Sequence, residues 1–79
     1  MKANQPKEKR MKVRIKNRGF YNVAGSKKVV GLAEGTVLKV VRRIKKDCIC
    51  DAEGQDNFFG EKIHGNVIVE MENLEVVND

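Results

Sequence analysis

The sequence predicts a small domain built from β-strands, and three observations support this fold class. Apolar and polar residues alternate from Met11 to Arg18 with the period of two that is typical of a half-buried strand. Val, Ile and Leu supply most of the apolar residues and favour a pleated, buried surface. Four glycines between residues 19 and 35 interrupt the chain too often for a long helix. The expected fold class is therefore all-β.

The length of 79 residues allows one hydrophobic core, and the composition changes at residue 11. Residues 1–10 are polar and basic and contain the only proline, so they are predicted to form a disordered basic arm. Residues 11–79 are predicted to form the domain. No apolar run approaches bilayer length and no secretory signal opens the chain, so we expect a cytoplasmic protein.

Alternation and β-branched content predict five short strands, which cover residues 11–18, 36–46, 48–52, 66–71 and 74–77. The glycine-containing residues 19–35 are expected to form a long ordered loop or an irregular hairpin. Val37 and Val41 on the cationic face of the second strand indicate a bulge or partial burial. An amphipathic helix is the alternative for this segment, and its valine content favours a strand.

Two stretches carry a resemblance to a known fold. Residues 35–40 (GTVLKV) followed by residues 48–54 (CICDAEG) are similar to the middle hairpin of SH3-like barrels and, more loosely, to KOW-type modules of ribosomal and transcription-associated proteins. Residues 67–76 resemble the strand, tight turn and closing strand of these barrels. The resemblance implies a five-stranded SH3-like small barrel whose closure removes exposed edges. Because the chain has no Trp, recognition of proline-rich peptides is not expected.

The charges are distributed unevenly along the chain. Residues 1–46 contain fifteen Lys or Arg and two acidic residues, whereas residues 47–79 contain one Lys and nine acidic residues. Such asymmetry predicts a basic surface that attracts polyanions, although folding could place acidic strands beside basic ones.

Cations on the outward side of the first strand, on its neighbour and in the long loop are the candidate nucleic-acid-binding residues. They would contact phosphates without reading sequence. The set is Lys12, Arg14, Lys16, Arg18, Lys27, Lys28, Lys39, Arg43 and Lys45. Lys and Arg also occupy such positions for solubility and edge protection, which is the competing interpretation.

The second hypothesis is a protein-interaction or regulatory factor, for example an accessory protein of a phage or mobile element. Its candidate surface comprises the aromatic residues Phe20, Tyr21, Phe58 and Phe59. The oligomeric state and the choice between DNA, RNA and protein partners stay open at this level.

No motif for catalysis or for a cofactor is present in the sequence. Cys48 and Cys50 have the spacing of core residues on a strand, and with His64 they fall short of the four ligands of a structural zinc site. The acidic residues of the 51–61 segment do not follow the calcium-loop pattern. We therefore expect a non-enzymatic binding module without metal or cofactor.

Overall fold

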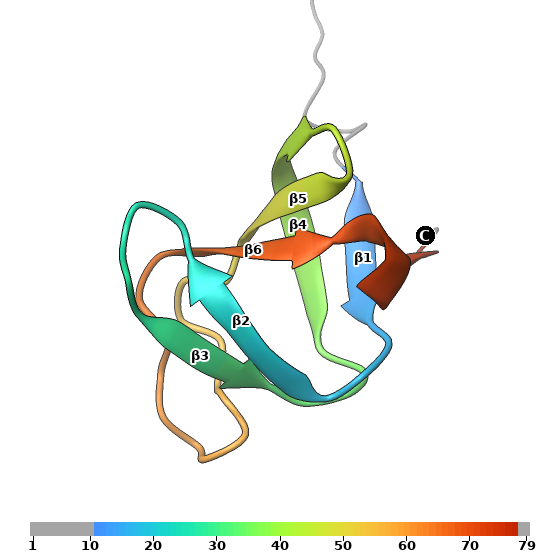
Figure 1. Cartoon of the computed structure of the whole chain (residues 1–79). Coiled ribbons are helices and arrows are strands. Elements are labelled where there is room, and N and C mark those ends of the chain that lie inside the picture. The colour runs from blue at the N-terminus through green and yellow to red at the C-terminus, as the bar shows by residue number, and fades with distance from the viewer. Residues whose placement is uncertain (1–10, 78–79) are drawn as a thin grey trace, which may run out of the picture.

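The computed structural model describes residues 11–77, which form one antiparallel sheet of seven strands (Figure 1). The elements are β1 (Lys12–Ile15), β2 (Gly19–Val23), β3 (Val29–Leu32), β4 (Val37–Ile44), β5 (Asp47–Asp51), β6 (Asn66–Glu70), the 3₁₀ helix η2 (Met71–Asn73) and β7 (Leu74–Val77). The strand order in the sheet is β3-β2-β6-β5-β4-β1-β7. The all-β prediction is confirmed. The basic arm predicted for residues 1–10 lies outside the described residues.

The sheet has two more strands than predicted and is not closed into a barrel. Residues 19–32 form a hairpin, β2–β3, and β2 pairs with β6 through Asn22↔Ile68 and Val23↔Val67. This hairpin extends the sheet at one end, so that β3 and β7 are its edges and do not pair with each other in the described chain. The prediction of a closed barrel of five strands is therefore wrong in both the number of strands and the closure.

One face of the curled sheet encloses the core (Figure 1). Alternate strand residues are buried, as the period of two requires, and η2 contributes no buried residue. The buried residues are Val13, Ile15, Leu32, Leu38, Val40, Cys48, Cys50, Ala52, Ile63, Val67, Val69 and Leu74. Because only one face is buried, charged and aromatic side chains concentrate on the outer face and in the turns. Within residues 11–77, no helix has the length and apolar character needed to span a bilayer.

Two details of the strands bear on the candidate site. The strand predicted for residues 11–18 ends at Ile15, because the chain bends at residues 16 and 17 before it enters β2. The segment predicted as residues 36–46 is a strand and not a helix, and its register shifts between Val40 and Arg42, so the predicted bulge is confirmed. The extra residue, Val41, is 55% exposed.

The two cysteines are free thiols inside the core, as expected from their spacing. Burial, together with a smaller effect of the neighbouring Cys48, raises the pKa of the Cys50 thiol to about 12. The pKa of Cys48 is also raised by burial, and its thiol donates to the Met71 sulfur. Both thiols are therefore neutral and act as small apolar side chains.

We predict that stability falls between about pH 9 and pH 12 because of Cys50. The unfolded chain loses this thiol proton first, so the stability gained by burying the neutral thiol is complete below pH 9 and is lost as the pH approaches 12. The slope is at most about 1.4 kcal/mol per pH unit. Urea unfolding of the wild type and Cys50→Ala across this range measures it. Equal pH dependence in both proteins would contradict the assignment.

Candidate functional site

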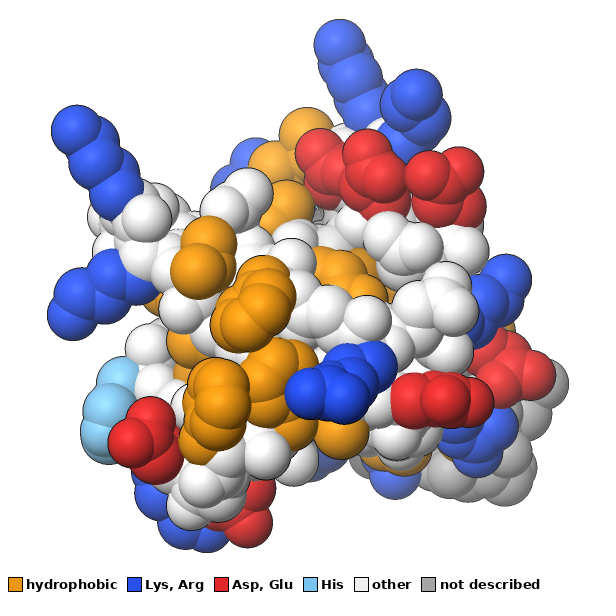
Figure 2. All heavy atoms as spheres, turned by 60° about the horizontal axis from the view of Figure 1, so that its bottom comes forward, with side chains coloured by type: hydrophobic (Ala, Val, Ile, Leu, Met, Phe, Trp, Pro, Cys, Tyr) orange, Lys and Arg blue, Asp and Glu red, His pale blue; other side chains and the backbone are white. Residues whose placement is uncertain are grey.

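All three phenylalanines of the chain meet on the outer face of the β2–β3 hairpin. The ring centroids of Phe20 and Phe58 are 5.2 Å apart, those of Phe58 and Phe59 are 4.7 Å apart, and both pairs meet edge to face. Phe20 is 62% exposed and Phe59 is 69% exposed. We call these three residues the aromatic cluster. Figure 2 shows hydrophobic side chains gathered on this face of the molecule, with Lys or Arg side chains beside them.

Gly31 provides the seat for the central ring of the cluster. Gly31 lies opposite Phe20 in the hairpin register, and a Cβ atom at Gly31 would lie 2.4 Å from the Phe58 ring. The Phe58 N–H also donates to the Gly31 carbonyl oxygen at 3.1 Å. Only a residue without a side chain allows this approach, so the glycine fixes where Phe58 lies.

The loop that carries Phe58 and Phe59 is ordered by its own hydrogen bonds. The Asn57 side-chain oxygen accepts from the N–H groups of Phe59 at 2.8 Å and Glu61 at 2.9 Å. Asp56 and Lys62 form an isolated bridge beneath this tip, and their side chains form an ion pair of 2.9 Å. The loop therefore presents the two rings in a defined conformation.

Arg18 joins the aromatic cluster instead of the row of cations in which it was predicted. Because β1 ends at Ile15, Arg18 leaves the face of β1, and its guanidinium carbon lies 4.6 Å from the centroid of the Phe58 ring. Its side chain is exposed and makes no ion pair with any residue in the 11–77 range. The guanidinium donors remain available to a ligand.

A groove of about 410 Å³ runs beside the aromatic cluster between β3 and the 57–64 loop. Phe20 and Phe59 line it together with Val29, which is 54% exposed. Its charged or titratable lining residues are Lys28, Lys62, His64 and Glu61. The groove thus combines apolar and polar lining residues, with two lysines and one carboxylate at its margins.

Two cations on β1 and β4 lie beside carboxylates of neighbouring strands. Arg14 pairs with Glu75 of β7 at 3.1 Å, and Lys39 lies directly across from Asp51 of β5. The acidic later strands are therefore placed beside the basic early ones. Lys12 lies across from Lys39 in the β1–β4 register and also makes interactions of its own.

The cations that keep no carboxylate partner within residues 11–77 are found mainly at two turns and next to the aromatic cluster. Lys27 and Lys28 lie at the β2–β3 turn, which the Lys28 N–H closes by donating to the Ser26 hydroxyl. Arg43 and Lys45 lie at the β4–β5 turn and are exposed. The described set without an ion-pair partner comprises Lys16, Arg18, Lys27, Lys28, Lys39, Arg42, Arg43, Lys45 and Lys46.

Lys45 has a left-handed backbone conformation, with φ of 57°. Among residues 11–77 it is the only residue other than glycine with positive φ. Glycine or asparagine is the residue expected at such a position, and lysine there is strained by about 1 kcal/mol. A cation is thus retained at the tip of the turn despite a backbone cost.

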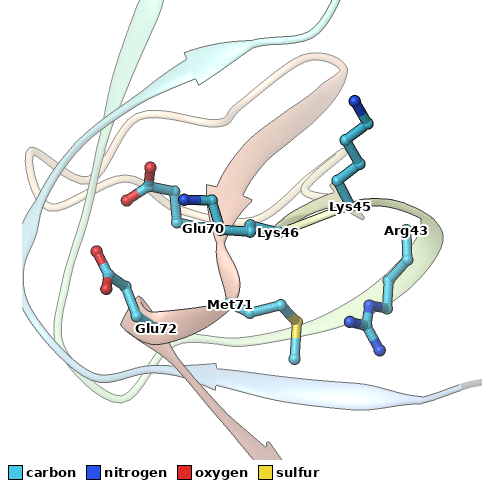
Figure 3. Close-up of a pocket in the computed structure, with 6 residues that line it drawn as sticks. All are labelled: Arg43, Lys45, Lys46, Glu70, Met71 and Glu72. Atoms are coloured by element: carbon cyan, nitrogen blue, oxygen red, sulfur yellow. The ribbon is translucent and has the colours of Figure 1, made fainter.

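A second hollow, of about 300 Å³, lies between the β4–β5 turn and η2. In Figure 3 the Lys46 ammonium points toward Glu70, Arg43 lies on the opposite side next to Met71, and Lys45 points away from both carboxylates. Opposite charges therefore face one another across this hollow. Lys46 consequently contributes less than Lys45 to the positive field at the turn.

The remaining candidate residues have structural roles. The Glu53 carboxylate accepts from the Gly65 N–H at 2.7 Å and lies 3.3 Å from the exposed His64 ring. Asp51 accepts from the Glu53 N–H. No group of three or more potential metal ligands occurs in residues 11–77.

Tyr21 is not brought into the aromatic cluster. It alternates to the inner side of β2, where its ring packs against the core. Its hydroxyl donates to the Asn17 carbonyl oxygen at 2.6 Å, and burial raises its pKa. Tyr21 therefore supports the hairpin from inside while Phe20 faces outward.

Comparison with known proteins finds no match among protein-family models, curated proteins or solved structures.

Three features were missed from the sequence: the stacking of Arg18 on Phe58, the contribution of Lys62 to the groove, and the exposed Arg42 next to the bulge in β4. The first two depend on where the strands end and how distant loops meet, and the third depends on the register shift in β4. One available signal was Gly31, because an isolated glycine within an apolar strand indicates close approach by another segment.

We predict that Gly31→Ala destabilises the protein by about 1–3 kcal/mol, because the new methyl group overlaps the Phe58 ring. In a Phe58→Ala background the same substitution should cost far less. Urea unfolding of the wild type, both single variants and the double variant gives this coupling. Additive effects would show that Phe58 does not rest on Gly31.

Proposed function

We propose that this protein is a non-enzymatic binding module that contacts the phosphates of nucleic acid. The proposal rests on exposed cations at the β2–β3 and β4–β5 turns and at Arg18, which form no ion pair within residues 11–77. Cations without carboxylate partners are the ones that can release counterions from a nucleic acid. The net charge of +5 acts in the same direction at long range.

The proposed contact surface lies at the turns and not on the β1 face that the sequence indicated. On the β1 face, Arg14 is held by Glu75, so a phosphate would compete with this carboxylate, and on β4 Lys39 lies across from Asp51 without forming an ion pair with it. At the turns, Lys27, Lys28 and Lys45 face solvent without such competition. This arrangement favours nonspecific electrostatic binding through flexible side chains on ordered turns.

The strained backbone of Lys45 supports the same function. A glycine would fit φ of 57° with less strain, whereas lysine places a positive charge at the tip of the turn. Strain that is tolerated at an exposed charge indicates a use for that charge.

As for ancestry, we infer a relationship to SH3-like barrels in which the first loop has become a hairpin. The succession of β6, η2 and β7 supports this, because a strand, a single 3₁₀ turn and a closing strand end those barrels. The sheet differs from those closed barrels in that β3 is an open edge.

We predict that duplex DNA binds with an affinity that falls steeply between about 50 and about 200 mM salt. The variant Lys27→Gln/Lys28→Gln should lower the slope of log affinity against log salt by about 1.8, since each lost phosphate contact removes about 0.9. Fluorescence anisotropy with a labelled duplex measures both quantities.

The matched control is Arg14→Gln, which removes one charge from a cation that is paired with Glu75 on the β1 face. Per charge removed, its slope should change by less than half as much. An equal loss per charge in both variants would return the contact surface to β1, and no binding at low salt would reject nucleic acid as the partner.

We predict opposite effects of Lys45→Gly on stability and on binding. The free energy of unfolding should rise by about 0.5 kcal/mol, because glycine relieves the left-handed strain. Affinity for duplex DNA should fall, because the turn loses its outermost charge. Thermal unfolding and anisotropy provide the two readouts, and a variant that is stabilised yet binds as tightly as the wild type would remove Lys45 from the surface.

A further inference from the structure

The aromatic cluster places most of the few aromatic residues of this chain at the surface and not in the core. Besides Tyr21 the protein has only its three phenylalanines, and two of them, Phe20 and Phe59, are more than 60% exposed. Exposed rings forgo the burial that would stabilise the core. Their gathering on one face indicates a binding surface and not a packing accident.

The rings are held in place before any ligand arrives. Phe58 rests on Gly31, donates its backbone N–H to the Gly31 carbonyl oxygen, and contacts the edges of Phe20 and Phe59. Asn57 fixes the backbone that precedes and follows these rings. A surface that needs no ordering on binding loses little entropy when it is covered.

The exposed rings of this surface favour a planar ligand, and the cations beside them favour an anionic one. The guanidinium of Arg18 lies over Phe58 and has no carboxylate partner in residues 11–77. Lys28 and Lys62 border the adjoining groove, and Lys62 is paired with Asp56. Among the described residues that line the groove, Glu61 is the only one with a carboxylate. Aromatic rings that alternate with cations suit bases and phosphates of one strand.

We propose that the aromatic cluster and Arg18 form a stacking platform for unpaired bases, so that the protein prefers single-stranded nucleic acid to duplex. This inference rests on the proposed function, because the same chain must also attract phosphates. Bases inside a duplex are already stacked on one another and cannot lie on Phe20 or Phe59, whereas single strands expose their faces. Phosphates of the same strand then reach Arg18 and Lys28.

The test compares labelled oligo(dT), oligo(U) and a duplex of about 20 nucleotides each in anisotropy titrations at fixed salt. We expect the single strands to bind at least tenfold more tightly than the duplex. The variant Phe20→Leu/Phe59→Leu keeps apolar side chains but removes the flat rings. It should lose about 10-fold or more in affinity for single strands and little for the duplex. The comparison of oligo(dT) with oligo(U) shows whether a 2′-hydroxyl matters.

Two controls separate this inference from the proposed function. Val41→Ala truncates another exposed apolar residue, on β4, and should leave all three affinities unchanged. Circular dichroism and thermal unfolding confirm that each variant is folded.

Equal affinity for single strands and duplex, or full single-strand affinity in Phe20→Leu/Phe59→Leu, would overturn the stacking platform while phosphate binding stands. The second result would show that the rings of the aromatic cluster do not contact the strand and would leave a protein as their candidate partner. Absence of binding to every probe at low salt would overturn both proposals.

Discussion

The constraint on which this structure depends is that a single curled sheet has only one face to bury. Alternate residues of β1, β5, β6 and the first half of β4 supply most of a core of twelve side chains, and within residues 11–77 no helix covers the other face of the sheet. The outer face, the turns and the edges therefore carry everything else. Strand endings and turn conformations, more than the core itself, decide which side chains meet there.

This division explains which parts of the molecule could be predicted from the sequence. The inward positions of β1, β4, β5 and β6 follow from period two, and the bulge follows from valines out of phase with that pattern. The β2–β3 hairpin was left undecided because its glycines disrupt the alternation. Yet one of them, Gly31, is the strand residue on which Phe58 rests. Local propensity describes single segments, whereas this contact joins two loops that lie far apart in the sequence.

The candidate site was predictable in composition but not in arrangement. The cations and the phenylalanines were identified, but their grouping required the fold. Pairing of β1 with β7 and of β4 with β5 brings Glu75 and Asp51 beside early cations, which offsets a small part of the uneven charge distribution along the sequence. Arg18 changes neighbours for a different reason, since β1 ends three residues before it. The placement of carboxylates beside early cations depends on the strand register. A shift of one residue would turn these side chains to the other face of the sheet.

The seating of Phe58 on Gly31 also affects how the molecule behaves toward copies of itself. β3 is an edge strand, and an uncovered strand edge offers backbone groups to which another chain can add a strand. The Phe58 N–H occupies the Gly31 carbonyl oxygen, and the ring lies over the middle of the same strand. The loop thus covers part of the β3 edge, so the contact that positions the aromatic cluster also hinders the addition of a strand from another copy.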